Sequence, residues 1–272
     1  MFDISIASYS FHGLYEIGAM NVFQYLETIR YRYACDKADI WNGMLVSYDE
    51  EYLKLIRQQM DERGITLMNL CCDGCHIWGD TQEARDRQEK LALDCIRAGE
   101  ILGARTVRID AGVVEKEMND EQLAFVTAGY NRYCALAAKY GARLGPENHW
   151  GATTNANEMR RLFASVRAEN FAMLLHVGNW VNTPDVKGSV ADESRLKYNV
   201  EFAPLAMHMH AMFEVCEQAE SQLLPLVKAG YKGAWSIESH LGTNEYNNVA
   251  YQLANVRRIL TPCDYADWRK KN

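Results

Sequence analysis

The amino-acid sequence predicts an α/β protein of the (β/α)8 class, a TIM barrel, formed by a single domain over residues 1–272. Short apolar runs alternate with longer segments of helical periodicity, which is the pattern of βα units around a parallel sheet. The number of such short runs is eight. The length of 272 residues suits a barrel, which needs about 250 residues, and no Pro/Gly/Ser-rich linker divides the chain.

The expected strands are rich in apolar and β-branched residues. In chain order they are Ile4–Ser8, Lys37–Trp41, Thr66–Leu70, Thr106–Asp110, Arg143–Glu147, Ala172–His176, Leu205–His210 and Ala234–Glu238. Eight parallel strands with helices between them close most naturally as a barrel. An open doubly wound sheet is the alternative, but no glycine-rich dinucleotide fingerprint follows the first run.

The segments between these runs carry an apolar stripe at helical spacing. They cover Val22–Tyr31, Glu50–Glu62, Thr81–Leu102, Asp120–Tyr140, Asn157–Arg167 and Glu217–Ala229. Several end on a glycine, which suits the left-handed position past a helix C-terminus. These are Gly64, Gly103, Gly141 and Gly230. We expect the last helix over Asn248–Leu260 and a C-terminal extension over residues 261–272.

The charge and the first residues limit the class of protein. With 29 Lys and Arg against 36 Asp and Glu, the net charge is −7, which disfavours a nucleic-acid partner. The first residues lack a basic segment followed by a long apolar one, and no run of about 18 apolar residues occurs later. We therefore expect a cytoplasmic protein with a small-molecule partner and no membrane contact.

Eight cysteines are present, and reduced thiols are the expectation for a chain of this class. The segment Cys72-Asp73-Gly74-Cys75 has the C-x-x-C spacing of a zinc site or a redox disulfide. A zinc site needs further ligands, and the sequence holds no second C-x-x-C. Packing in the core is therefore the favoured interpretation of this motif.

Four residues at successive strand ends are candidates for chemistry. Strands five to eight end at Glu147, His176, His210 and Glu238. The carboxyl ends of barrel strands meet at one mouth, so these side chains are expected to converge there. Carboxylate and imidazole groups suit Mn²⁺, Zn²⁺, Fe²⁺ or Co²⁺. A single histidine at a strand end is more often only a hydrogen-bonded group, so the prediction depends on the joint placement of all four.

The motifs around these residues resemble the xylose isomerase-like superfamily of sugar isomerases and epimerases. They are Pro146-Glu147-Asn148-His149, Val177-Gly178-Asn179-Trp180, Met207-His208-Met209-His210 and Trp235-Ser236-Ile237-Glu238. The resemblance spans essentially the whole chain. It implies a divalent metal, most often Mn²⁺, with Zn²⁺, Co²⁺, Fe²⁺ and Mg²⁺ as alternatives. By position, Glu147, His176, His210 and Glu238 would hold it.

The chain departs from the family pattern at two places. His176 stands where an aspartate is usual, which removes one negative charge and shifts the metal preference. The family sequence H-x-H-x-K-D has a lysine and an acid after the second histidine. Here His210 is followed by Ala211-Met212-Phe213-Glu214. The missing lysine disfavours a phosphorylated substrate.

The chemistry implied is proton transfer next to a carbonyl, with a metal-stabilised enediolate. Glu147 and Glu238 are the expected catalytic carboxylates, and the resemblance places them on opposite sides of the sugar carbon. His149 is either a further base or a partner that orients Glu147. Substrate contacts are expected from residues near the same mouth: His208, Asn179, Trp180, Arg108, Trp41 and His76.

The leading prediction is an isomerase or epimerase of an unphosphorylated keto-sugar or sugar derivative. A lyase that cleaves a 3-keto glycoside by β-elimination is the close alternative, because it would use the same site. An endonuclease IV-like role fits poorly with seven histidines and a negative net charge. A non-catalytic barrel subunit is the remaining class. A homo-oligomer or a hetero-subunit partner is left open by the sequence.

Overall fold

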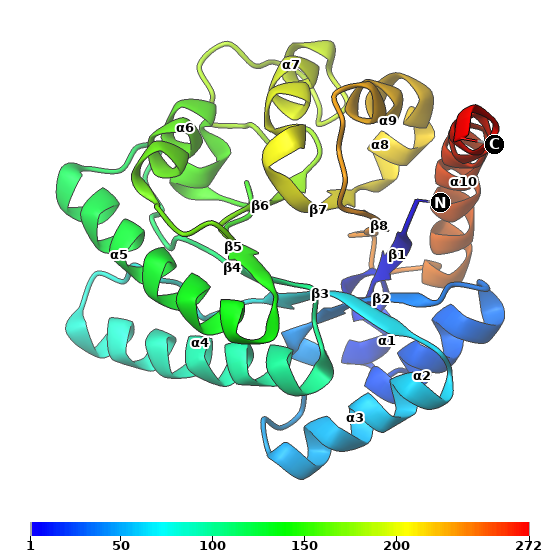
Figure 1. Ribbon diagram of the computed structural model, residues 1–272, viewed down its shortest axis with the longest axis horizontal. Helices are drawn as coiled ribbons and strands as arrows, with labels where there is room; N and C mark the ends of the chain where they lie inside the picture. The colour runs from blue at the N-terminus through cyan, green and yellow to red at the C-terminus, as the bar shows by residue number, and fades with distance from the viewer. Residues whose placement is uncertain (1, 272) are drawn as a thin grey trace.

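The computed structural model describes residues 2–271, and all of their side chains except those of residue 265 and residues 267–271. Eight parallel strands form one sheet in the order β5-β4-β3-β2-β1-β8-β7-β6. Bridges from Leu144 to Phe171 and from Glu147 to Leu174 join the two edges and close the ring. Helices surround the strands (Figure 1). The prediction of a (β/α)8 barrel is confirmed.

All eight expected strands form, with ends that differ from expectation by no more than two residues. They are β1 (Ile4–Ala7), β2 (Lys37–Trp41), β3 (Thr66–Cys72), β4 (Thr106–Ile109), β5 (Arg143–Gly145), β6 (Met173–His176), β7 (Ala206–Ala211) and β8 (Ala234–Ile237). Most strand residues are buried on both sides, because one side faces the barrel interior and the other faces the helices.

The helices follow the expected segments, with additions. They are α1 (His12–Glu16), α2 (Val22–Glu27), α3 (Glu50–Glu62), α4 (Gln82–Leu102), α5 (Asp120–Ala137), α6 (Ala156–Ser165), α7 (Glu193–Phe202), α8 (Phe213–Glu217), α9 (Ala219–Lys228) and α10 (Glu245–Lys271). Helices α1 and α7 were not expected, and neither was α8, which shares only Glu217 with the expected segment Glu217–Ala229. Helix α2 ends early because a π-helical turn, Thr28–Arg32, follows it.

Helix α10 continues past the residue where we expected it to end, Leu260, and includes Pro262. Residue 272 of the expected extension lies outside the described residues. The backbone N–H of Phe2 donates to Asp264 of this helix at 2.9 Å, so the beginning of the chain and α10 lie side by side (Figure 1). Within residues 2–271, none of the helices has the length and apolar content needed to cross a bilayer.

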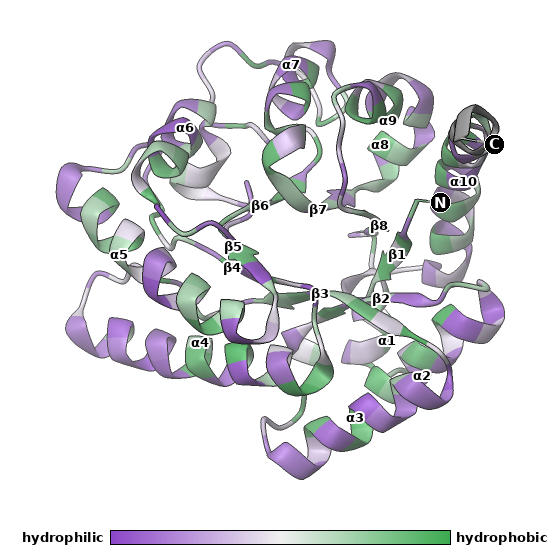
Figure 2. Ribbon diagram, in the orientation of Figure 1, coloured by the Kyte–Doolittle hydropathy of each residue, from purple (hydrophilic) through white to green (hydrophobic). Residues whose placement is uncertain are grey.

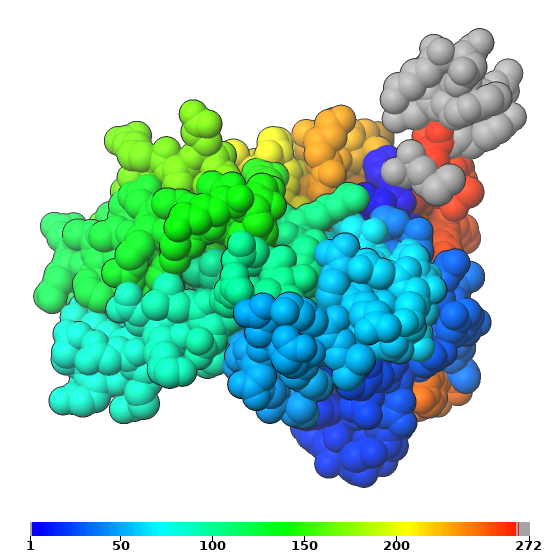
Figure 3. Space-filling model, turned by 60° about the horizontal axis from the view of Figure 1, so that its bottom comes forward, coloured from blue at the N-terminus to red at the C-terminus, as the bar shows by residue number. Residues whose placement is uncertain are grey.

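Most of the longer outer helices turn an apolar stripe toward the barrel (Figure 2). In α3 the stripe is Leu53, Ile56 and Met60, all buried. Helices α3 and α4 lie next to each other and cover one side of the barrel (Figures 1 and 3). The four glycines that end helices have positive φ angles between 62° and 85°, as expected from the sequence. These turns return the chain to the next strand.

The closure between β5 and β6 depends on Gly145. A Cβ atom at this position would lie 1.7 Å from the carbonyl oxygen of Ala172, so no other residue fits without moving the backbone. The close approach lets Leu174 N donate to Pro146 O at 2.8 Å. Gly145 therefore fixes the backbone that leads to Glu147.

Gly145→Ala should separate β5 from β6 and lower the free energy of unfolding by about 3 kcal/mol, because the overpacked atom is backbone. Gly141→Ala is the matched control. Its Cβ would meet nothing within 4 Å, and only its φ of +79° is unfavourable, at about 1 kcal/mol. Chemical denaturation measures both effects, and hydrogen exchange at Leu174 should accelerate only in Gly145→Ala. Equal stability of the two variants would contradict the prediction.

Candidate active site and metal centre

A cavity of about 310 Å³ opens at the carboxyl ends of the strands. In a (β/α)8 barrel this end carries the active site, because the βα loops meet there. Five of the strands contain lining residues, and the segments that follow β5 and β8 supply Glu147 and Glu238. The lining residues are Ala7, Tyr9, Asp39, Trp41, Cys71, Asp73, Arg108, Glu147, His149, His210, Glu238 and His240.

The structure brings together all four residues expected at the ends of strands five to eight. His176 Nδ1 lies 2.8 Å from Glu147 Oε1. His210 Nδ1 lies 3.2 Å from Glu238 Oε2 and 3.5 Å from Glu147 Oε1. All four are buried, and three of them line the cavity while His176 lies directly behind Glu147. Their roles stay predictions, but their convergence is a feature of the fold.

Two ring nitrogens in this group are buried and lack a hydrogen-bond partner within the described chain. They are His176 Nε2 and His210 Nδ1. A buried imidazole nitrogen without a partner costs free energy, and a cation coordinated to it removes that cost. Glu147, His176 and His210 each place a ligand atom within 4.8 Å of the others. The donor set therefore fits a divalent metal ion.

The carboxylates of the group are held ionised. Burial acts to raise the pKa of Glu147, but His149 and Arg108 outweigh it and hold the pKa well below its usual range. Burial opposes the ionisation of Glu238 in the same way, and His210 with its neighbours holds that pKa low. Two ionised carboxylates beside imidazole nitrogens give the cavity the charge that attracts a cation.

A buried aspartate beneath the cavity orients His210. Asp39 Oδ2 accepts hydrogen bonds from His208 Nε2, His210 Nε2 and Ser236 Oγ, each at 2.8 Å. Its other oxygen accepts from Asn69 Nδ2 at 2.9 Å. Because Nε2 of His210 is bound to Asp39, Nδ1 is turned toward the glutamates. This is the geometry in which a carboxylate fixes the ring of a metal-binding histidine.

Arg108 is the other buried centre of charge. Its guanidinium contacts Glu147 Oε2 at 3.1 Å, Asp110 Oδ2 at 3.0 Å and Asp73 Oδ1 at 2.7 Å. It also lies against the Cys71 thiol. The guanidinium therefore compensates three carboxylates and draws one oxygen of Glu147 away from the histidines.

Two histidines border the group. His149 Nδ1 contacts Asp110 Oδ2 at 2.9 Å, and His240 Nε2 contacts Glu238 Oε2 at 2.9 Å. Burial acts to lower the pKa of His149, but the charges of Glu147 and Asp110 outweigh it and raise the pKa to about 9. Both rings line the cavity. His149 is thus oriented by Asp110 and does not contact Glu147 through a hydrogen bond.

The residues expected to contact substrate divide into two sets. Trp41 and Arg108 line the cavity, and the Trp41 indole N–H donates to Asp73 Oδ2 at 2.8 Å. His208, Asn179, Trp180 and His76 are not among the described lining residues. For these four, substrate contact stays a prediction.

The second set makes contacts within the protein. Asn179 donates to the backbone oxygens of Asn148 and His149, both at 2.7 Å, and so supports the loop after β5. Trp180 is fully buried and donates to Asn199. The His76 ring packs against Trp150 at 4.8 Å between centroids.

Two lining residues, Asp39 and Tyr9, were missed in the sequence. Asp39 could have been recognised as an acidic residue inside a predicted buried strand, because a buried carboxylate needs a polar or charged partner. Tyr9 follows the first strand, and its ring contacts Trp41 and His240 edge-on at 5.2 and 5.1 Å. An aromatic residue directly after a barrel strand was the available signal.

Comparisons with known proteins agree with this architecture. Curated protein sequences give no match. Three solved structures, each 13% identical in sequence, superpose over nearly the whole chain. A xylose isomerase domain protein from Planctomyces limnophilus has a TM-score of 0.69, with 96% of this chain and 98% of that chain covered. 3-Keto-D-glucoside 4-epimerase from E. coli has a TM-score of 0.69 with coverages of 93% and 99%, and D-psicose 3-epimerase with D-tagatose from Clostridium cellulolyticum H10 has a TM-score of 0.67 with coverages of 97% and 99%. Identities this low show a shared fold.

A comparison of the sequence with protein-family models assigns the chain to a family. The family model described as xylose isomerase-like TIM barrel matches residues 31–212, which is more than half of the chain. This range contains Glu147, His176 and His210, and Glu238 comes directly after the next strand, β8. The chain therefore belongs to the xylose isomerase-like TIM barrel family.

Proposed function

We propose that this protein is a divalent-metal-dependent epimerase or isomerase of an unphosphorylated keto-sugar or sugar derivative. One observation carries the proposal: Glu147, His210 and Glu238 line one cavity with His176 against Glu147, and the buried His176 Nε2 and His210 Nδ1 make no well-aligned hydrogen bond within the described chain. Structures named as epimerases of D-psicose and of a 3-keto-D-glucoside share the fold, which supports a sugar as the substrate class.

Glu147, His176, His210 and Glu238 would hold the metal ion. When bound, such an ion supplies Lewis-acid polarisation of a carbonyl and its neighbouring hydroxyl group. Asp39 keeps His210 in the ring orientation that binding requires, and Asp110 similarly orients His149. Mn²⁺ fits the carboxylates, while the two imidazoles also suit Zn²⁺, Fe²⁺ and Co²⁺.

The proton on the carbon next to the carbonyl would move to a glutamate. Glu238 and Glu147 approach the cavity from β8 and β5, with His210 between them. A sugar carbon placed between the two carboxylates would present one face to each, which is the arrangement that inversion needs. His149 binds Asp110 through Nδ1 and therefore has its Nε2 edge for a substrate oxygen.

The cavity suits a neutral substrate better than a phosphate ester. Among its described lining residues Arg108 is the one arginine or lysine, and three carboxylates already compensate it. Tyr9 and Trp41 supply aromatic surface on which a sugar ring can stack. These contacts favour a ketose or a keto-glycoside, whose polar groups are hydroxyls and a carbonyl.

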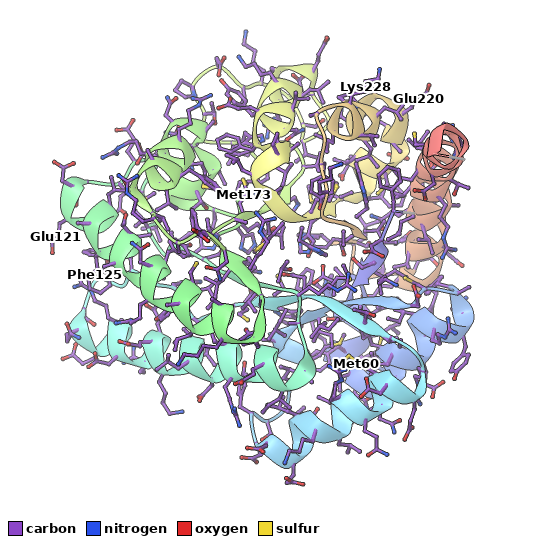
Figure 4. All side chains as sticks on the ribbon, viewed as in Figure 1. Met60, Glu121, Phe125, Met173, Glu220 and Lys228 are labelled. Carbon is purple, nitrogen blue, oxygen red and sulfur yellow. The ribbon has the colours of Figure 1, made fainter. Side chains whose placement is uncertain are left out.

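The test of activity uses the purified chain with Mn²⁺ and two substrate series, free ketoses and 3-keto-glycosides. We expect epimerised or isomerised product that disappears on chelation and returns with Mn²⁺. Glu147→Gln should lower kcat/KM by about 1000-fold, the range for loss of a general base. Glu220→Gln is the control, because Glu220 projects from the outer helix layer (Figure 4). An unsaturated keto-sugar as the product would indicate β-elimination and overturn the epimerase proposal.

His176→Asp tests the departure from the usual ligand set. The carboxylate restores the missing negative charge, so Mn²⁺ affinity should rise relative to Zn²⁺ affinity by about tenfold, because carboxylate oxygen suits Mn²⁺ better than imidazole does. His176→Asn has nearly the same shape without the charge and should weaken both ions. Isothermal titration with each ion measures the ratio. An unchanged ratio in His176→Asp would show that His176 is no ligand.

Asp39→Asn tests the orientation of His210. The amide carries no negative charge and replaces one acceptor oxygen with an NH2 donor, so it holds His208 and His210 less firmly and Mn²⁺ affinity should fall by about 10- to 100-fold. Ser236→Ala removes one hydrogen bond to Asp39 and leaves its contact with His210, so affinity should stay within about threefold. Thermal unfolding without metal separates a folding defect from a binding defect. Equal loss of affinity in the two variants would contradict a role in orienting His210.

A further inference from the structure

Three buried thiols gather outside the cavity, between the sheet and helix α4. Cys72 ends β3, Cys75 follows Gly74, and Cys95 lies on α4. Their sulfur atoms lie within 4.8 Å of one another, and all three residues have no exposed surface. Gly74 has a φ of +74°, which turns the chain so that Cys75 returns toward Cys72. The C-x-x-C motif thus gains a third thiol from a helix.

This cluster is separate from the carboxylate and imidazole group. Successive strand residues point to opposite faces of a sheet, so Cys71 faces the cavity and Arg108 whereas Cys72 faces α4. Cys72, Cys75 and Cys95 are absent from the described lining of the cavity. The chemistry proposed above uses none of them.

Polar groups beside Cys95 favour a thiolate. The Tyr48 hydroxyl lies 3.3 Å from Cys95 Sγ, and Asn42 Nδ2 lies 3.9 Å from it. The neighbouring thiols of Cys72 and Cys75, and then the Tyr48 hydroxyl, hold the pKa of the Cys95 thiol well below its usual range. Cys95 Sγ therefore lies beside a hydroxyl and an amide group that can donate hydrogen bonds to a thiolate.

We propose that Cys72, Cys75 and Cys95 bind a thiophilic divalent ion, Zn²⁺, at a second metal site of this barrel. Three sulfur ligands in a dry environment select soft or borderline ions over Mn²⁺ and Mg²⁺. Zinc at about 2.3 Å from each sulfur places the sulfurs about 3.8 Å apart, so a small contraction of the cluster suffices. The half-buried Tyr48 hydroxyl, 3.3 Å from Cys95 Sγ, is a neutral oxygen that would be available as a fourth ligand.

The charge favours a divalent over a monovalent ion. Zn²⁺ binding releases the remaining thiol protons to water and leaves three thiolates around a 2+ ion, with a net charge of −1. A monovalent ion such as Cu⁺ would leave −2, and burying additional charge is unfavourable. The reaction exchanges protons for a metal ion, so it requires no oxidant.

Zinc at this position would support the wall of the cavity. Asp73 lies between Cys72 and Cys75 in the chain, and its carboxylate contacts Arg108 and Trp41. Asn42 binds both the N–H and the C=O of Asp73 and also approaches Cys95. The ion would thereby join β3 and α4 behind the residues that line the cavity.

The experiment titrates the reduced, metal-free full-length protein with Co²⁺ as an optical probe and then with Zn²⁺. Cobalt bound to thiolates gives a sulfur-to-metal charge-transfer band, which oxygen and nitrogen ligands do not give. We expect the band in the wild type and in Glu147→Gln, which impairs the other site, and its loss when Zn²⁺ is added. Cys95→Ser and Cys75→Ala should lower Zn²⁺ affinity by more than about 100-fold, exceeding the effect of an outer-sphere change.

Cys134→Ser is the matched control, because Cys134 is also buried but bonds to the backbone oxygen of Leu144. It should keep the band. Circular dichroism identifies any variant that fails to fold, and two different cysteine variants guard against that failure. A folded wild type without a charge-transfer band, a band that persists in both cysteine variants, or a Cys72–Cys75 disulfide found by mass spectrometry in place of metal would overturn the proposal.

Discussion

Buried negative charge at the mouth of the barrel is the constraint on which the rest of the site depends. Asp39, Asp110, Glu147 and Glu238 are each no more than 6% exposed. An ionised carboxylate removed from water costs several kcal/mol unless donors surround it. The inward positions of the neighbouring strands are therefore filled by imidazole and guanidinium groups in place of the aliphatic side chains that usually fill a barrel.

The strands and four of the site residues could be predicted because local pattern determines them. The alternation of short apolar and longer helical segments placed every strand, and a polar residue at the end of such a run marks the mouth of the barrel. Helix α7 was missed because Arg195 and Asn199 share its buried face with Tyr198 and Phe202, so its apolar stripe is interrupted. Its N-terminus is nevertheless capped by Asp192, which accepts from Ser194 N.

Residues whose role depends on contacts across the barrel could not be predicted in this way. Asp39 contacts His210 from a strand 171 residues away in the sequence, and Cys95 reaches the C-x-x-C motif from a helix. The direction of aromatic side chains is equally non-local. Trp180 packs on Phe202 with ring centroids 4.9 Å apart, away from the cavity, whereas Tyr9 faces it. Residue type alone does not distinguish these two outcomes.

His176 and Arg108 both make the site less negative than a ligand set with a carboxylate at position 176 and no neighbouring guanidinium. In the proposed ligand set the imidazole of His176 would stand in place of a carboxylate and remove one negative charge, and the Arg108 guanidinium compensates one oxygen of Glu147. Two carboxylates then balance a divalent cation, where three would leave an excess of negative charge. Because less of its charge is neutralised by ligands, a cation held here would attract a substrate carbonyl oxygen more strongly. With His176 as a ligand, as proposed, the site would bind Mn²⁺ less tightly and would favour ions that accept imidazole, so an imidazole at this position would trade affinity for Mn²⁺ against Lewis acidity.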